Sequence, residues 1–315
     1  MLLILAVQLF SQIAFSAQNS CLGEIESKIC VTALAPRTWP DPAVQCGRAD
    51  SGTVTKIKAI AQDFSDPFQK ILCGLDKIFI IDEQGGSAFG GYTQDSAGHF
   101  HSFLGLNSVV LNKASSLSSW ASWKEQLSFG GSSDSSQISS SLPVIQAEIP
   151  GVYSDFLFFV LSHEMGHILD FANHVRTQGC GSETDCEMDS TGFGHFSWKT
   201  LNQIRPSSDF SERSRLCFYG CHGQFLDWVV STSIYKSLYQ AGFISLYSST
   251  NSADDFAESV AFYNISQIPG VKYRVQTPQG ESYYPLSEFQ SGILAEKNRF
   301  IEKLLQRTDL IFGGK

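Results

Sequence analysis

The fold is decided by residues 154–173, which read SDFLFFVLSHEMGHILDFAN. Apolar side chains surround nearly the whole of this segment, and a helix that is apolar almost all round is a buried one. Ser154 or Asp155 offers a side-chain cap at its start. We therefore predict a buried helix from Ser154 to about Asn173, on which the rest of the domain packs.

The same segment contains His163 and His167, four residues apart. On a helix this spacing places both imidazoles on one face, where they can hold one zinc ion. Glu164 follows the first histidine and can point towards a reacting water, so its natural role is that of a general base. Two imidazoles and a carboxylate are costly on a buried helix unless they are paired or bind a metal. The alternative is a hydrogen-bonded polar cluster without a metal ion.

A third protein ligand is needed, because catalytic zinc sites use three and keep the fourth position open. A histidine ten residues after His163 is one known solution, but Asn173 holds that position and His174 is one residue out of register. The best candidates are Asp254 and Glu258, which are again four apart on a predicted helix. One of them could bind the metal while the other accepts a hydrogen bond from a ligating imidazole.

Together these segments resemble the zinc site of the anthrax-lethal-factor-like peptidases, which include the Pro-Pro endopeptidases. That family has HExxH on one helix, then a tyrosine, and seven residues later a glutamate ligand followed by an aromatic-Ala-Glu run. Here Tyr247 precedes Asp254 by seven residues, and Phe256-Ala257-Glu258 follows. The ligand position holds Asp254 in place of glutamate, one methylene shorter, so Glu258 stays open as the alternative ligand.

The resemblance implies a zincin-like fold and a zinc-dependent endopeptidase that cleaves proteins or peptides. The roles that it implies are Zn²⁺ ligation by His163, His167 and Asp254, general-base catalysis by Glu164, support of a ligand by Glu258 and oxyanion stabilisation by Tyr247. Two other functions stay open. One is a zinc-dependent hydrolase of cell-wall cross-links. The other is a catalytically inactive, exported binding module stapled by zinc, although a staple needs neither Glu164 nor Tyr247.

Composition and charge narrow the class of partner. The chain has 315 residues, of which 43% are hydrophobic and 17% charged, so it can bury a substantial core. Its formal net charge is −9, with no basic run. Nucleic acid and anionic lipid both require a basic face, so neither is the expected main partner. We expect a monomer that acts on protein or peptide.

The first 17 residues carry no charge, and residues 2–10 are mostly apolar. Small residues at Ala14 and Ser16 have the spacing that signal peptidases prefer. We predict a cleaved signal peptide over residues 1–17 and a secreted or periplasmic protein. The apolar run is too short to span a membrane, so no stable membrane insertion is expected after cleavage. The alternative is a buried N-terminal helix or strand.

Eight cysteines follow this segment, and an even number in an exported chain predicts disulfide bonds. The pairing cannot be deduced from the sequence, although Cys180 with Cys186 and Cys217 with Cys221 are the closest pairs. A second zinc site that uses Cys217, Cys221 and His222 is the alternative.

The chain divides into a cysteine-containing lead-in at 18–50 and a catalytic domain at 51–315. The domain is predicted to be α+β, with a small twisted sheet on the HExxH helix and a mainly helical C-terminal half. Two insertions are expected, a Ser/Gly-rich surface segment near 114–141 and a cysteine-pinned excursion near 175–222. The expected strands are 77–81 and 101–111, with a hairpin at 273–284. Further helices are expected at 54–64, 224–239, 251–264 (with Ser252 as cap) and 287–307. His99 and His101 alternate along a strand that is expected to border the cleft.

Overall fold

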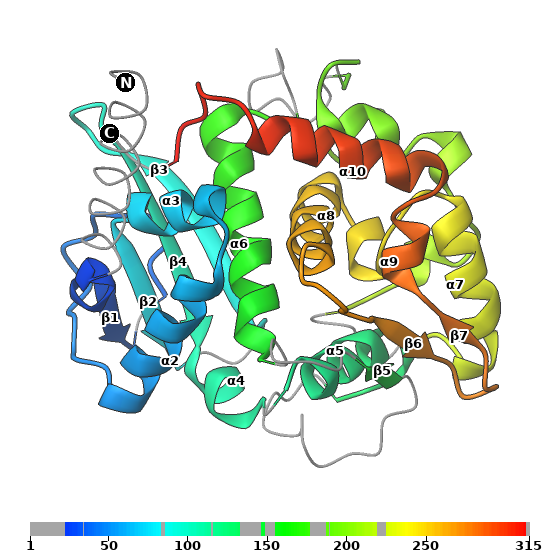
Figure 1. Cartoon of the computed structure of the whole chain (residues 1–315), viewed down its shortest axis with the longest axis horizontal. Helices are drawn as coiled ribbons and strands as arrows, with labels where there is room; N and C mark the ends of the chain where they lie inside the picture. Colours follow the sequence, from blue (N-terminus) through cyan, green and yellow to red (C-terminus); the bar gives the residue numbers. More distant parts are fainter. Residues whose placement is uncertain are drawn as a thin grey trace, which may run out of the picture.

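The α+β class is confirmed in the computed structural model, which is shown in Figure 1. The structure describes residues 23–33, 35–82, 86–114, 116–132, 146–148, 155–176, 187–188, 190–218 and 225–312. The predicted signal peptide at 1–17 lies outside the described residues. A small sheet with its helices forms one side of the molecule, and a mainly helical assembly forms the other.

The main sheet has four strands in the order β1-β2-β4-β3. β1 (Ile29–Thr32), β2 (Lys77–Ile81) and β4 (Phe100–Asn107) are parallel, whereas β3 (Ala88–Gln94) runs antiparallel to β4 at one edge. β1 comes from the predicted lead-in, which is therefore part of the domain's sheet. The strand predicted at 101–111 ends at Asn107, because the Asn107 side chain caps the helix α4 (Ser108–Lys113).

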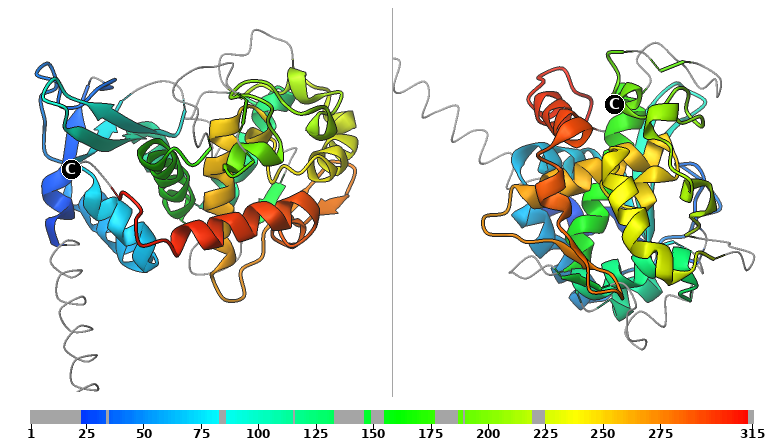
Figure 2. Two further views of the ribbon diagram at one scale, coloured as in Figure 1. Left: turned by 90° about the horizontal axis from the view of Figure 1, so that it is seen from above. Right: turned by 90° about the vertical axis from the view of Figure 1, so that its right-hand side faces the viewer.

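The HExxH segment forms α6 (Phe156–Asn173), and Asp155 caps its start by accepting from the backbone N–H of Leu157. Nearly every side chain of α6 is buried. Helices α2 (Ser51–Asp63) and α3 (Asp66–Gly74) pack against it beside the sheet. Viewed from above in Figure 2, α6 lies between the sheet and α8 (Ser252–Ser266), which carries the predicted third ligand.

Gly166 determines how closely α6 and α8 approach each other. A Cβ at this position would lie 2.9 Å from the Ala257 Cα and 3.3 Å from the Val260 Cβ. A hydrogen bond also links the two helices: the Asn264 Nδ2 of α8 donates to the Ser162 Oγ of α6 at 2.8 Å. The short separation places the first turn of α8 opposite the histidines of α6.

Gly166→Ala is therefore expected to destabilise the protein. Overpacking against a backbone atom costs about 1–3 kcal/mol, and the better helix propensity of alanine returns at most about 1 kcal/mol. We expect a net loss of about 1–2 kcal/mol of unfolding free energy in a denaturant titration. Gly23→Ala is the control, since an added Cβ there meets nothing within 4 Å. Equal stability of the two variants would contradict this close packing.

The prediction of a surface insertion at 114–141 is wrong for its first part, because these residues belong to the core. Residues 117–126 form α5 (Leu117–Gln126), which begins with a capping box between Ser116 and Ser119. Trp120 and Trp123 are 3% and 4% exposed. The Trp120 indole donates to the Ser87 Oγ at 2.8 Å, which ties α5 to the start of β3. Residues 133–141 lie outside the described residues.

The C-terminal half is mainly helical, with α7 (Ser231–Gln240), α8, α9 (Pro285–Glu288) and α10 (Gly292–Leu305). The predicted helix 287–307 is thus broken, since Gly292 has a φ of 53° where the chain turns. α7 begins later than the predicted residue 224, after a turn of 3₁₀ helix at Trp228–Val230. The predicted hairpin is confirmed by the antiparallel pairing of β6 (Arg274–Gln276) with β7 (Ser282–Tyr283). β6 also pairs with β5 (Gln146–Glu148).

Disulfide bonding is confirmed for the described cysteines. Cys30 pairs with Cys46, and Cys73 and Cys217 are also disulfide-bonded. The sulfur of Cys217 is therefore not a zinc ligand, which excludes the alternative second zinc site. The predicted pair Cys180 with Cys186, and also Cys221, lie outside the described residues.

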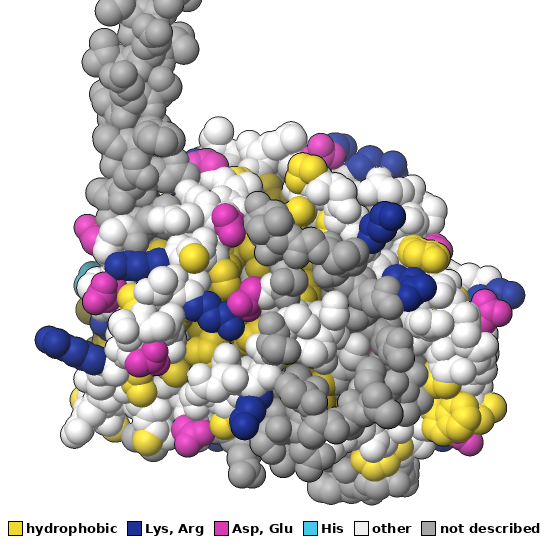
Figure 3. Space-filling view, turned by 60° about the horizontal axis from the view of Figure 1, so that its bottom comes forward, with side chains coloured by type: hydrophobic (Ala, Val, Ile, Leu, Met, Phe, Trp, Pro, Cys, Tyr) yellow, Lys and Arg dark blue, Asp and Glu magenta, His cyan; other side chains and the backbone are white. Residues whose placement is uncertain are grey.

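The distribution of charged side chains on the surface is consistent with a sequence that has no basic run. On the face shown in Figure 3, basic and acidic side chains are interspersed and do not gather into a patch of one sign. Among the described residues, no helix combines the length and apolar character that crossing a membrane requires.

Candidate metal centre

Three side chains from α6 and α8 bring one ligand atom each to the same point. The Nε2 atoms of His163 and His167 lie 3.1 Å apart. The Asp254 Oδ1 lies 3.5 Å from the Nε2 of His163 and 3.4 Å from the Nε2 of His167. Among the described residues this is the one group of His, Cys, Asp or Glu side chains that could hold a metal ion in this way. The sequence-predicted ligands are thus brought together.

The Asp254 carboxylate is oriented by the residues that start its own helix. Its other oxygen, Oδ2, accepts from the Asn251 Nδ2 at 2.5 Å and from the Thr250 hydroxyl at 3.5 Å. Asn251 is also the N-cap of α8, where its Oδ1 accepts from the N–H groups of Ala253 and Asp254. The prediction that Ser252 caps this helix is wrong, because the Ser252 hydroxyl donates instead to the Leu201 carbonyl. One asparagine therefore both begins the helix and aims the carboxylate.

The electrostatic environment of the two imidazoles favours a cation. Burial lowers the pKa of His163, but the carboxylates of Asp254 and Glu258 outweigh burial and raise the pKa to about 9. Burial likewise raises the pKa of Asp254, yet the two histidines hold this pKa well below its usual value. Positive charge is thus stabilised between these side chains even where water is excluded.

Glu258 stands behind His163 on the side away from the ligand atoms. Its Oε1 lies 2.9 Å from the His163 Nδ1, and the same oxygen accepts from the Lys124 Nζ at 2.9 Å. The Oε2 accepts from the Ser245 hydroxyl at 2.6 Å. Burial raises the pKa of Glu258, but Lys124 and His163 outweigh burial and lower it to about 2. Glu258 is therefore a carboxylate that faces the outer nitrogen of an imidazole, as groups that support metal ligands do.

Glu258→Gln is expected to weaken zinc binding about 10–100-fold, as loss of such supporting groups does. It also removes the buried charge that pairs with Lys124, and breaking a buried pair costs about 3–5 kcal/mol of stability. The double variant Lys124→Met/Glu258→Gln removes both charges, so it should recover stability without recovering zinc affinity. Chelator competition and thermal unfolding measure the two quantities. Wild-type zinc affinity in Glu258→Gln would contradict the supporting role.

Glu164 is buried beside the ligands but makes no hydrogen bond through its Oε2. Burial raises its pKa, and the charges of His163 and His167 oppose this only in part. The edge strand β3 lies directly against it, since a Cβ on Gly90 would meet the Glu164 carbonyl oxygen at 2.9 Å and its Oε2 at 3.5 Å. A buried carboxylate with an unsatisfied oxygen and a raised pKa is well suited to proton transfer.

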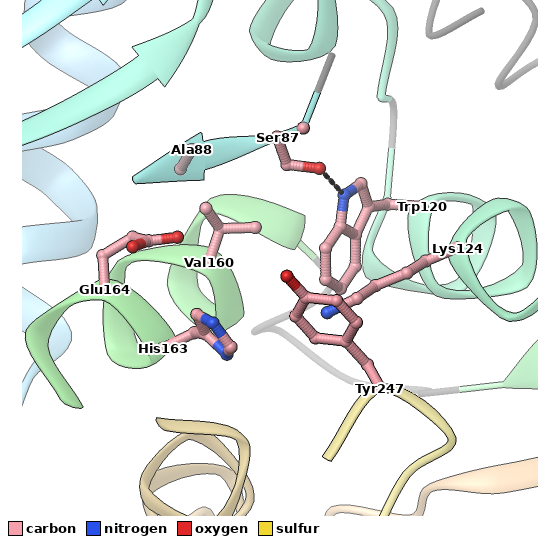
Figure 4. A pocket seen from close by; sticks show the side chains of 9 residues that line it. Ser87, Ala88, Trp120, Lys124, Val160, His163, Glu164 and Tyr247 are labelled. Atoms are coloured by element: carbon pink, nitrogen blue, oxygen red, sulfur yellow. Dashed lines mark hydrogen bonds between the residues drawn. The ribbon is translucent and has the colours of Figure 1, made fainter. Parts of the chain in front are cut away.

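A small pocket opens on this side of the ligands, as Figure 4 shows. Its lining comes from β3 and the residues before it, from α5, from α6 and from Tyr247, and consists of Gly86, Ser87, Ala88, Trp120, Lys124, Val160, His163, Glu164 and Tyr247. The Tyr247 ring lies 5.9 Å from the His163 ring, centroid to centroid, and its hydroxyl points into the pocket. The predicted general base, one predicted metal ligand and the predicted oxyanion donor therefore share one pocket.

His99 and His101 do not line this pocket. The His99 Nδ1 and the His101 Nε2 each lie 3.3 Å from the same oxygen of Asp95. The strand β4 that carries His101 is also not an edge strand, because β3 lies outside it. The expectation that the His101 strand borders the cleft is wrong, and β3 holds that place.

Three residues that shape the site were not predicted, namely Lys124, Ser245 and Asn251. Lys124 lies in the Ser/Gly-rich segment, where the helical spacing of Leu117, Trp120 and Ala121 was the available signal. Asn251 is a favourable N-cap residue immediately before the predicted helix. Ser245 has no such signal, because it comes from an irregular segment.

Comparison with known proteins adds no assignment, since no family model, curated protein or solved structure matches this chain.

Proposed function

We propose that this chain is an exported, zincin-like zinc endopeptidase whose metal is held by His163, His167 and Asp254. The observation that carries the proposal is the triangle of ligand atoms, with sides of 3.1, 3.4 and 3.5 Å. A tetrahedral zinc ion with bonds of about 2.0–2.1 Å requires ligand atoms about 3.3–3.4 Å apart. Two imidazoles and one carboxylate are also a ligand set that catalytic zinc uses.

When bound there, zinc would polarise the scissile carbonyl and lower the pKa of the attacking water. Glu164 accepts the proton of that water and passes it to the leaving amine. Tyr247 donates a hydrogen bond to the oxyanion that develops on the carbonyl oxygen. Burying the Glu164 Oε2 without a hydrogen bond costs stability. This cost argues against an inactive module in which zinc would only stabilise the fold.

The edge strand β3 supports a peptide as the substrate. It is antiparallel to β4, lies at the edge of the sheet and begins at the pocket, where Ser87 and Ala88 contribute to the lining. An extended peptide can add to such an edge through backbone hydrogen bonds. This would carry the scissile bond past Glu164 and the metal ligands.

The test is digestion of a generic quenched-fluorescence peptide library and, in parallel, of cross-linked cell-wall fragments. We expect cleavage of peptides that a zinc chelator abolishes and added zinc restores. Cleavage of the cell-wall fragments alone would assign the other hydrolase function. Failure of fully zinc-loaded protein to cleave either substrate would overturn the proposal.

A further inference from the structure

Lys124 is a buried cation at the wall of the pocket. It comes from α5, is 6% exposed, and places its Nζ 2.9 Å from the Glu258 Oε1. The same Nζ lies 4.0 Å from the centroid of the Tyr247 ring and 5.0 Å from that of Trp120. One ammonium group therefore contacts the carboxylate behind His163 and the aromatic ring that faces the pocket.

A stabilising role alone does not account for this position. A buried ion pair is on average no better for stability than apolar side chains of the same size, and methionine could fill the space of Lys124. The chain also contains a purely internal pair, in which Lys297 and Asp255 are fully buried and lie 2.8 Å apart. Lys297 lines no part of the pocket. Lys124 differs in that two of its partners, Glu258 and Tyr247, belong to the proposed catalytic site.

We infer that Lys124 is a positioning residue, which holds the Tyr247 ring and the Glu258 carboxylate in fixed relation to His163. The catalytic part of this inference rests on the proposed function. The ammonium lies against the ring at a distance typical of cation–π contacts, and its hydrogen bond to Glu258 anchors it from the other side. Figure 4 shows the Lys124 nitrogen next to the Tyr247 ring, whose hydroxyl enters the pocket.

The contact itself is tested without any activity measurement. The ten tyrosines are labelled as 3-fluorotyrosine, and the ¹⁹F resonance of Tyr247 is assigned by its loss in Tyr247→Phe. We expect Lys124→Met to shift and broaden this resonance, Lys124→Arg to restore it largely, and the matched variant Lys297→Met to leave it in place. Lys124→Met/Glu258→Gln serves if the single variant does not fold, and it should shift the resonance too.

The catalytic consequence is tested by a double-mutant cycle. Misplacing a catalytic group costs about 10–100-fold, so Lys124→Met should lower kcat by this factor, with KM nearly unchanged and zinc retained. In a Tyr247→Phe background the same substitution should cost clearly less than in the wild type, because the hydroxyl that Lys124 positions is gone and only the effect through Glu258 remains.

An unmoved Tyr247 resonance in Lys124→Met, or an equal shift in Lys297→Met, would overturn the inference. Losses of kcat that multiply independently in the double variant would overturn it as well. If the protein cleaves no peptide, the proposed function fails separately, and the ¹⁹F spectra still decide whether Lys124 positions Tyr247.

Discussion

Glu164→Gln is expected to lower kcat by about 10⁴-fold or more while the zinc content stays at one ion per chain. General acid–base assistance is typically worth about 10²–10⁴-fold, and here one carboxylate serves both the water and the leaving amine. The glutamine keeps the size of the side chain but accepts no proton. Folding should survive, because a neutral amide in a buried position avoids the cost of a buried charge.

The chain offers a matched control for this substitution in Glu125. That glutamate is also buried, and burial is the main reason why its pKa rises to about 7. It accepts from the Tyr235 hydroxyl and does not line the pocket. Glu125→Gln should therefore keep kcat within a few-fold of wild type. The measurements are zinc by mass spectrometry and the cleavage rate. Full zinc with near-wild-type turnover in Glu164→Gln would end the mechanism proposed for this site.

Asp254→Ala is expected to abolish stoichiometric zinc and, with it, all measurable cleavage. It removes one of three ligand atoms and leaves two imidazoles, which bind zinc far more weakly than a complete site. The fold should persist, since Asn251 still caps α8. Zinc content after dialysis and the circular dichroism spectrum measure the two effects.

The comparison of Asp254→Ala with Glu258→Gln decides between the two candidate ligands. The geometry favours Asp254, because its Oδ1 faces both Nε2 atoms whereas Glu258 faces the Nδ1 of His163. If Glu258→Gln loses the metal and Asp254→Ala keeps it, the two roles must be exchanged.

The sequence predicted the elements whose apolar pattern is strong. α6 and β2 were located to within a residue or two, because one is apolar nearly all round and the other is a short apolar run between polar residues. That His163 and His167 lie together was also predictable, since residues four apart on a helix share a face, whereas the choice of Asp254 as their partner came from the family resemblance. The close approach of α6 to α8 could not be predicted, because Ala257, the surface that Gly166 packs against, is 91 residues away in the chain. Gly166 permits this approach, but nothing local indicates its partner.

Composition misled the prediction for α5. A segment rich in serine and glycine resembles a surface loop, yet Lys124 and Glu125 from it are buried against α8 and α7. A charged residue is normally expected at the surface. The sequence alone therefore predicts exposure for these two residues, whereas their pairing with other helices buries them. β3 was not expected as a strand, so the position of β4 inside the sheet was missed as well. Which strands pair depends on long-range contacts and not on local pattern alone.

The most direct test of the metal centre is an anomalous difference map from crystals of the protein, measured on both sides of the zinc absorption edge. We expect one peak, bonded to the Nε2 atoms of His163 and His167 and to the Oδ1 of Asp254, with Glu164 nearby but not bonded. A peak coordinated by Glu258 in place of Asp254, or no zinc peak in crystals grown with equimolar zinc, would contradict this ligand assignment.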